Sequence, residues 1–237
     1  MGSSIKLNHR LYNDVLYSIM DEKDSLDYIK NVSKDDVPKS IWKEHGKTTE
    51  DWARYAHENN LWYPTTVYRN DLPYAYISNG SEYVEVYFLD ERMFEYIYMA
   101  YKKIDAEKLF LTKIYVRSYG NKVDKPLADL EKDINIVFSQ KGGLNVRERT
   151  FLREERLKVL EENKEAAHPV NVSQNWKKKP KYGEYEELLD YESIIKPGDL
   201  LRGIDTSLLN PPTDENSNLE NEKKDNHWQL PPGWKKN

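Results

Sequence analysis

Cysteine is absent from the 237 residues of this chain. Its absence excludes a disulfide framework, a thiolate zinc site and a cysteine nucleophile, which removes three classes of function. The five histidines never fall within helical or turn spacing of one another: His9, His45, His57, His168 and His227. We therefore expect no zinc-binding box and no bound cofactor.

Long apolar runs are also missing. No stretch approaches the roughly 18 apolar residues that a membrane span requires. The opening "MGSSIKLNHR" has no apolar block of the kind found in signal peptides, and Lys6 stands where a myristoylation signal carries Ser or Thr. These absences predict a cytoplasmic chain that makes no membrane contact.

Recognisable catalytic motifs are absent as well. Ser, His and Asp all occur, but no nucleophile elbow selects any of them as a catalytic set. The segment "QKGGLN" matches neither GxGxxG nor GxxxxGK, so we interpret it as a hairpin turn rather than a phosphate cradle. These observations favour a protein without enzymatic activity.

The only basic cluster is "WKKKPK", Trp176 to Lys181. Its lysines could contact nucleic acid phosphates while Trp176 stacks on a base. However, a chain with a pI near 5.7 lacks the broad basic face of nucleic-acid binders. We interpret the cluster as a solvated loop and expect no nucleic acid partner.

The N-terminal quarter predicts four helices. A second helix is expected to begin near Asp24, a third to begin around Pro38 and end at Gly46, and a fourth to be capped by Thr48 or Thr49. The first is predicted over residues 8–20, where six residues recur at the spacing of one helical face: Leu11, Tyr12, Val15, Leu16, Ile19 and Met20.

From Thr65 onward, apolar residues recur at every second position, which indicates strands. "TTVYR", "YAYIS" and "EYVEVYFL" predict an antiparallel meander, and residues 108–119 and 133–140 predict two further strands. Helical spacing returns in "DERMFEYIYMAYKKI" (residues 90–104), which predicts a helix packed on the sheet. The charged stretch of residues 146–167 predicts a long C-terminal helix.

Together these elements predict an α+β fold: N-terminal helices, then an antiparallel sheet with a packed helix, a charged C-terminal helix and a disordered C-terminal tail. We expect one domain over residues 1–204. Its helical part covers 5–62, its sheet part 65–150 and its C-terminal helical part 151–204. Residues 205–237 have hardly any apolar side chains and are expected to be disordered.

Within this tail, Leu230 to Trp234 resembles the opening of a WW domain, whose first strand typically begins Leu-Pro-Pro-Gly-Trp. The sequence continues for only three residues beyond this match, so we expect no WW domain. Two interpretations remain for the tryptophan-rich cluster. It folds back onto the domain, or it serves as a short docking motif.

One short stretch, residues 81–104, combines five tyrosines and two phenylalanines with five carboxylates. Residues 70–100 contain six acids and a single base, Arg92, so the local net charge of −5 equals that of the whole chain. Tyrosine offers a large, rigid contact area, and a one-signed patch steers a partner of opposite charge. The residues predicted to bind a partner are Glu82, Glu85, Tyr87, Asp90, Glu91, Glu95, Tyr96 and Tyr98. The alternative is that the tyrosines cover a sheet edge and the carboxylates keep it soluble.

Three hypotheses of function follow. The favoured one is a non-enzymatic cytoplasmic protein that binds a basic protein partner, similar in general character to the bacterial immunity proteins that neutralise a toxin. The second is an enzyme that uses paired carboxylates drawn from Glu82, Glu85, Asp90 and Glu91, either alone or with a divalent metal. The third is a structural or scaffold component that recruits a partner through its tail.

Overall fold

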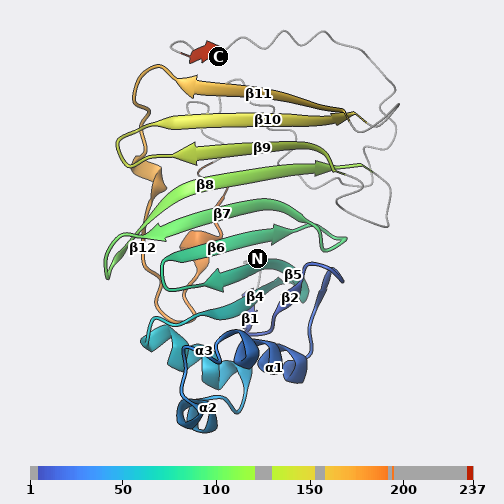
Figure 1. Cartoon of the computed structure of the whole chain (residues 1–237), viewed down its shortest axis with the longest axis vertical. Helices are drawn as coiled ribbons and strands as arrows, with labels where there is room; N and C mark the ends of the chain where they lie inside the picture. Colours follow the sequence, from blue (N-terminus) through green and yellow to red (C-terminus); the bar gives the residue numbers. More distant parts are fainter. Residues whose placement is uncertain (1–4, 121–129, 153–157, 192–193, 195–233, 237) are drawn as a thin grey trace.

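A computed structural model describes residues 5–120, 130–152, 158–191, 194 and 234–236 (Figure 1). The helices are α1 (Glu22–Val32), α2 (Lys39–His45) and α3 (Thr49–Glu58). The fold is broadly α+β, but one large sheet dominates it. Its strands are β1 (Ile5–Asn8), β4 (Tyr63–Arg69), β5 (Leu72–Asn79), β6 (Tyr83–Leu89), β7 (Glu95–Lys103), β8 (Lys108–Tyr119), β9 (Leu130–Phe138), β10 (Leu144–Leu152), β11 (Lys158–Ala166), β12 (Trp176–Lys178) and β13 (Trp234–Lys236).

The sheet is an antiparallel meander from β4 to β11, with β1 added beside β4. Each strand pairs with the next one in the sequence, and the helices lie together at the β4 end (Figure 1). The short strand β12 pairs with the first part of β8, whereas β9 pairs with its later part. The predictions of α1, α2, α3, β4, β5, β6, β8 and β9 are confirmed.

The helix predicted over residues 8–20 is wrong. This segment forms a hairpin of β2 (Tyr12–Asn13) and β3 (Ser18–Ile19). The Asn13 side chain accepts hydrogen bonds from the backbone N–H groups of Val15 and Leu16, and Tyr17 has a φ of 48°. This local turn chemistry outweighs the apolar spacing, and it leaves Val15 77% exposed instead of packed.

The helix predicted over residues 90–104 is also wrong, because this segment is a tight turn followed by β7. The Asp90 carboxylate accepts hydrogen bonds from the N–H groups of Arg92 and Phe94, which closes the turn. The pairing of β6 with β7 then shifts register between Phe88 and Leu89, at a β-bulge. A bulge shifts by one residue the alternation of side chains between the two faces of the sheet. The apolar residues of β7 therefore do not show a simple period of two.

The long charged helix predicted over residues 146–167 is wrong too. The described residues of this segment form the paired strands β10 and β11, and those of the expected helical part 151–204 also form β12 and two short 3₁₀ turns. Charges that alternate along a chain suit a solvated helix, but they also suit neighbouring strands. Here Arg149 lies opposite Asp133 on one side and Glu161 on the other.

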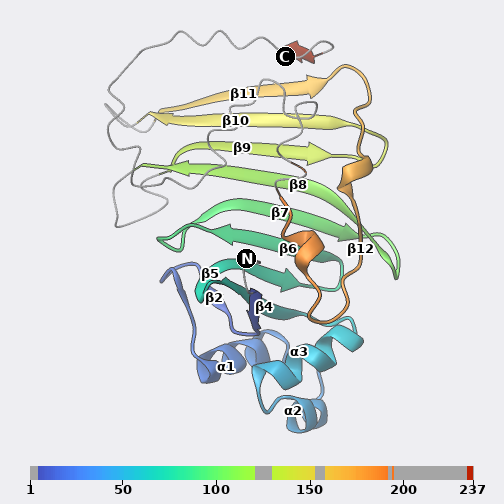
Figure 2. The ribbon, with the colours of Figure 1, turned by 180° about the vertical axis from the view of Figure 1, so that it is seen from behind.

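One face of the sheet, the apolar face, holds the main core. Alternate residues of each strand point into it, such as Val86, Met99 and Ile114. The chain returns after β11 and crosses this face, as Figure 2 shows, placing Leu188 and Leu189 against it. The core therefore lies between a single sheet and a segment that has little regular secondary structure.

A second core lies between the helices and β4. Trp52 is fully buried and stacks on Trp42 with ring centroids 3.8 Å apart. Thr48 caps α3 by accepting a hydrogen bond from the N–H group of Asp51, as predicted, and Asp21 caps α1 in the same way through the N–H group of Asp24. None of the helices in the described ranges is long and apolar enough to cross a membrane.

A polar cluster joins the two cores. The buried hydroxyl of Tyr63 lies 2.7 Å from Nδ1 of His57 and 2.9 Å from the hydroxyl of Tyr185. Nearby, the Tyr182 hydroxyl lies 2.9 Å from Nε2 of the buried His9. Hydrogen bonds therefore tie the helical part to the returning segment as well as to the sheet.

Most of the tail predicted to be disordered lies outside the described residues. Its strand β13 pairs with β11, with Trp234 opposite Ala166 and Lys236 opposite Lys164. Of the two interpretations of the tryptophan-rich cluster, this pairing favours the one in which the tail folds back onto the domain.

The cover of the apolar face is tested by Leu188→Ala. Leu188 is 1% exposed against the sheet, and truncating such a leucine removes buried area and leaves a cavity. We expect the free energy of unfolding in urea to fall by about 2–5 kcal/mol. Leu72→Ala is the matched control because Leu72 is 68% exposed, and we expect it to stay within about 0.5 kcal/mol. Equal losses for the two variants would contradict the packing described.

The polar cluster predicts a pH dependence of stability. Burial lowers the pKa of both His9 and His57 below the ordinary value of 6.5, and Lys179 adds to the effect at His57. Below about pH 6.5 the unfolded chain therefore binds protons that the folded chain resists, so the free energy of unfolding falls as the pH drops. His57→Gln should make this fall between pH 7.5 and 5.0 shallower, by up to about 1 kcal/mol because the ring is partly solvated.

Urea denaturation at the two pH values measures this effect. His168→Gln is the control, because His168 lies exposed in the returning segment. An equally steep fall for wild type and His57→Gln would show that the burial of His57 contributes nothing to the pH dependence.

Candidate functional site

The opposite face of the sheet, the tyrosine face, carries a row of four tyrosines directly opposite one another on adjacent strands. Tyr76 pairs with Tyr87, Tyr87 with Tyr98, and Tyr98 with Tyr115. The ring centroids of successive pairs are 5.7, 4.9 and 6.0 Å apart. Rings at these separations stabilise one another across the strands. The row is therefore a pre-arranged aromatic surface.

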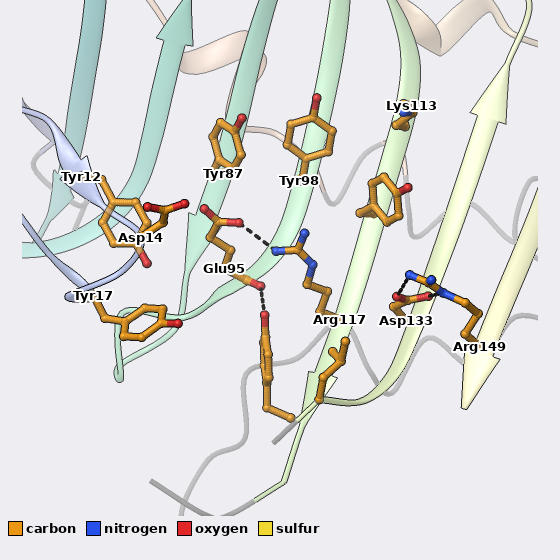
Figure 3. A pocket seen from close by; sticks show the side chains of 13 residues that line it. Tyr12, Asp14, Tyr17, Tyr87, Glu95, Tyr98, Lys113, Arg117, Asp133 and Arg149 are labelled. Atoms are coloured by element: carbon orange, nitrogen blue, oxygen red, sulfur yellow. Dashed lines mark hydrogen bonds and ion pairs between the residues drawn. The ribbon is translucent and has the colours of Figure 1, made fainter. Parts of the chain in front are cut away.

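A row of alternating charges runs beside the tyrosines (Figure 3). Arg117 donates a hydrogen bond of 2.8 Å to Glu95, and Arg149 donates one of 2.9 Å from Nε to Asp133. In register, Arg117 lies opposite Asp133 and Arg149 lies opposite Glu161. Each charge thus has an opposite charge on a neighbouring strand, which keeps the row ordered.

The bulge in β7 explains why Glu95 joins this row. In a regular strand Glu95 would share a face with Ile97, which is buried in the core, and Tyr96 would share one with Tyr98. Instead Tyr96 lies on the apolar face, where its ring packs edge-on against Tyr191. The extra residue at the bulge turns the Glu95 carboxylate to the tyrosine face.

The β2–β3 hairpin forms one wall of a groove over the tyrosine face. The Tyr12 hydroxyl donates a hydrogen bond to the Met93 carbonyl, and Tyr17 packs edge-on against Phe94. The groove has a volume of about 550 Å³. Its lining balances three carboxylates against three bases, with six tyrosines and one leucine: Asp14, Glu95, Asp133, Lys113, Arg117, Arg149, Tyr12, Tyr17, Tyr87, Tyr98, Tyr115, Tyr119 and Leu130.

Among the tyrosines of this lining, Tyr119 stands apart because Arg117, two residues away on β8, offsets part of the effect of burial on its hydroxyl. Burial raises the pKa of Tyr119 to about 12, and its hydroxyl donates a hydrogen bond of 2.8 Å to the Glu95 carbonyl. Burial raises the pKa of Tyr87 and of Tyr98 further above the ordinary value. At neutral pH these side chains are therefore neutral hydroxyl groups, suited to hydrogen bonding rather than to nucleophilic attack.

Two kinds of hydroxyl occur in the groove. Tyr98 donates a hydrogen bond of 2.6 Å to Glu85, so its position is held by a carboxylate. Within the part of the chain that the structure describes, the hydroxyls of Tyr17, Tyr87 and Tyr115 have no hydrogen-bond partner. Those three groups remain available to a ligand.

The eight residues predicted from the sequence to bind a partner do not all lie on one surface. Glu85, Tyr87, Glu95 and Tyr98 lie together on the tyrosine face, where they form a surface that is both aromatic and acidic. The other four lie elsewhere. Glu82 and Glu91 are exposed in the turns before and after β6, Asp90 is buried against Arg92, and Tyr96 lies on the apolar face.

In the folded chain, bases from other strands balance the negative charge of residues 81–104. Arg117, Lys113 and Arg149 come from β8 and β10, and they balance the acids of the groove. The sequence analysis did not predict these three bases as part of the site, although the sequence contains one pattern that indicates two of them. The alternation "KIYVRSY" places Lys113, Tyr115, Arg117 and Tyr119 on one face of a strand.

The carboxylates of the enzyme hypothesis are not brought together. Glu82 and Asp90 flank the seven residues of β6, and eight residue steps along a strand place them about 26 Å apart. The Asp90 carboxylate is also occupied by Arg92 and by the turn that it closes. Among the described residues, no group of three or more His, Asp or Glu side chains is arranged to hold a metal ion.

The role of the Tyr98 hydroxyl is tested by Tyr98→Phe. This change removes a hydrogen bond to a carboxylate that is half-buried, so we expect the free energy of unfolding to fall by about 1 kcal/mol. Tyr87→Phe is the matched control on the neighbouring strand, and we expect it to stay within about 0.5 kcal/mol. Urea denaturation measures both. A larger loss for Tyr87→Phe than for Tyr98→Phe would overturn this account of the two hydroxyls.

Comparisons with models of protein families, with curated proteins and with solved structures found no match to this chain. The function is therefore inferred from the sequence and the structure of this chain.

Proposed function

We propose that this chain is a non-enzymatic protein-binding protein and that the tyrosine face holds its partner. The observation that carries the proposal is the row of paired tyrosines in an open groove, with hydroxyls that have no partner among the described residues. Tyrosine is enriched where proteins bind one another, because its rigid ring loses little conformational entropy and its tip forms hydrogen bonds.

The rigidity of the surface supports this function. Tyr87 and Tyr98 each contact a ring on both neighbouring strands, so their positions are set before any partner arrives. A surface ordered in advance spends less free energy on ordering when it binds. The groove is thus suited to a partner that fits it without rearrangement.

The charges indicate how the partner is oriented. Arg117 and Arg149 are paired with carboxylates of the sheet, whereas Asp14 and Glu91 have no ion-pair partner within the described ranges. Both lie at the hairpin end, because Asp14 belongs to the hairpin and Glu91 to the turn that Tyr12 contacts. We place the basic side chains of the partner there, where unpaired carboxylates attract them.

A bacterial immunity protein is the cellular role that we propose. Such a protein acts in the cytoplasm by covering a toxin, which requires a pre-formed binding surface and no catalysis. The likeness to immunity proteins is a general one, since it rests on a small acidic α+β chain without catalytic motifs. A basic toxin would present its positive side chains to the hairpin end of the groove.

The test uses the protein encoded by the open reading frame directly upstream, where an immunity protein has its toxin. We expect it to bind the purified chain by surface plasmon resonance. Tyr87→Ala should speed dissociation and weaken binding by about 2 kcal/mol or more if the ring is a buried anchor of the interface. Asp14→Lys with Glu91→Lys should slow association, since exposed charges act mainly on the on-rate.

Tyr83→Ala is the matched control, because Tyr83 is exposed at the start of the same strand, β6, and lies outside the groove. Each variant is also checked for its melting temperature, so that misfolding is not mistaken for lost binding. Absence of binding by the upstream protein would overturn the immunity role. Binding that Tyr87→Ala leaves unchanged would overturn the assignment of the tyrosine face.

A further inference from the structure

A second pocket, which shares no residue with the groove, lies where three distant segments meet. The end of α3 contributes His57, the start of β8 contributes Lys108, and β12 with the residues after it contributes Lys178, Lys179 and Lys181. The pocket has a volume of about 590 Å³. We refer to it as the lysine pocket.

Strand pairing forces positive charges together in this pocket. Lys108 on β8 lies directly opposite Lys178 on β12. Like charges at opposed positions destabilise a sheet. Lys178 and Lys179 follow Trp176 and Lys177 in the basic cluster noted in the sequence, so the fold adds Lys108 of β8 and the ring of His57 to that cluster.

Carboxylates of the described residues neutralise little of this positive charge. Glu107 is the only acid in the lining, and it forms no ion pair among the described residues. Asp105 lies in the β7–β8 turn, where its Oδ1 accepts hydrogen bonds from the N–H groups of Glu107 and Lys108. Lys181 has a contact of 3.9 Å to Glu184, in which both side chains are largely exposed.

Two further groups border the cluster with defined positions. Nδ1 of His57 is occupied by the Tyr63 hydroxyl, which leaves Nε2 as the ring nitrogen for a ligand. Lys103, at the end of β7, donates a hydrogen bond of 2.8 Å to Asn60. Burial and the charge of Lys179 lower the pKa of Lys103 to about 8.

We propose that the lysine pocket binds a small ligand that carries two or more linked phosphate groups. An oxyanion with several charges offsets the repulsion between opposed lysines, and lysines bind phosphate oxygens as point charges. The volume falls within the range of small-molecule sites, and the short basic stretch lacks the extended track that a nucleic acid chain occupies. This site is independent of the proposed partner surface.

The test is isothermal titration calorimetry with inorganic tripolyphosphate and with inorganic phosphate. We expect tripolyphosphate to bind the wild-type chain, inorganic phosphate to bind more weakly, and added salt to weaken both. The variant Lys108→Gln with Lys178→Gln should bind tripolyphosphate at least tenfold more weakly. The control, Lys39→Gln with Lys43→Gln, removes two exposed lysines of α2 and should bind as the wild type does.

A second measurement separates binding from folding. Without ligand, the Lys108→Gln and Lys178→Gln variant should melt at the same temperature as the wild type or higher, because it removes a like-charge pair. Equal affinity of the pocket variant and the control variant for tripolyphosphate would overturn the proposal, as would no binding to the wild type. Tighter binding of single-stranded oligothymidylate than of tripolyphosphate would also overturn it, in favour of a nucleic acid ligand.

Discussion

The need to cover one apolar face of a single long sheet governs this structure. A meander of this size buries its core only if another layer packs against it, and here the layer is the segment that follows β11. Tyr185, Leu188 and Leu189 supply its apolar contacts, while the hydroxyl of Tyr185 joins Tyr63 at the edge of the helical part. Because this segment covers the apolar face, the core does not require a second layer on the tyrosine face. On that face the β2–β3 hairpin forms one wall of the groove.

The bulge in β7 divides the side chains of the sheet between these two faces. It sends Tyr96 into the core beside Tyr191 and turns Glu95 toward Arg117. A register shift of one residue thus places Tyr96 in the core and Glu95 in the row of opposite charges. The tyrosines form their row from equivalent positions on neighbouring strands, so the antiparallel register aligns them as well.

The two candidate sites differ in how their charges are compensated. In the groove, arginines of β8 and β10 pair with carboxylates, which leaves hydroxyls and the hairpin end to recognise a partner. In the lysine pocket, opposed lysines on β8 and β12 lack such compensation among the described residues. A balanced aromatic surface suits a protein partner, whereas an unbalanced cluster of cations suits a small polyanion.

The sequence by itself determined the elements whose signals are local. Thr48 caps α3, Gly46 ends α2, and the alternation of β4, β5 and β6 follows from side chains that point to opposite faces. Tyr87 was predicted for the same reason, whereas Tyr98 was predicted on a segment that was expected to be a helix and forms β7 instead. Tertiary structure alone decided β7, β10 and β11, because a bulge hides the period of β7 and alternating charges fit a helix as well as paired strands. It also decided which bases meet Glu95 and Asp133, since that depends on strand register, a long-range property that no short stretch of sequence contains.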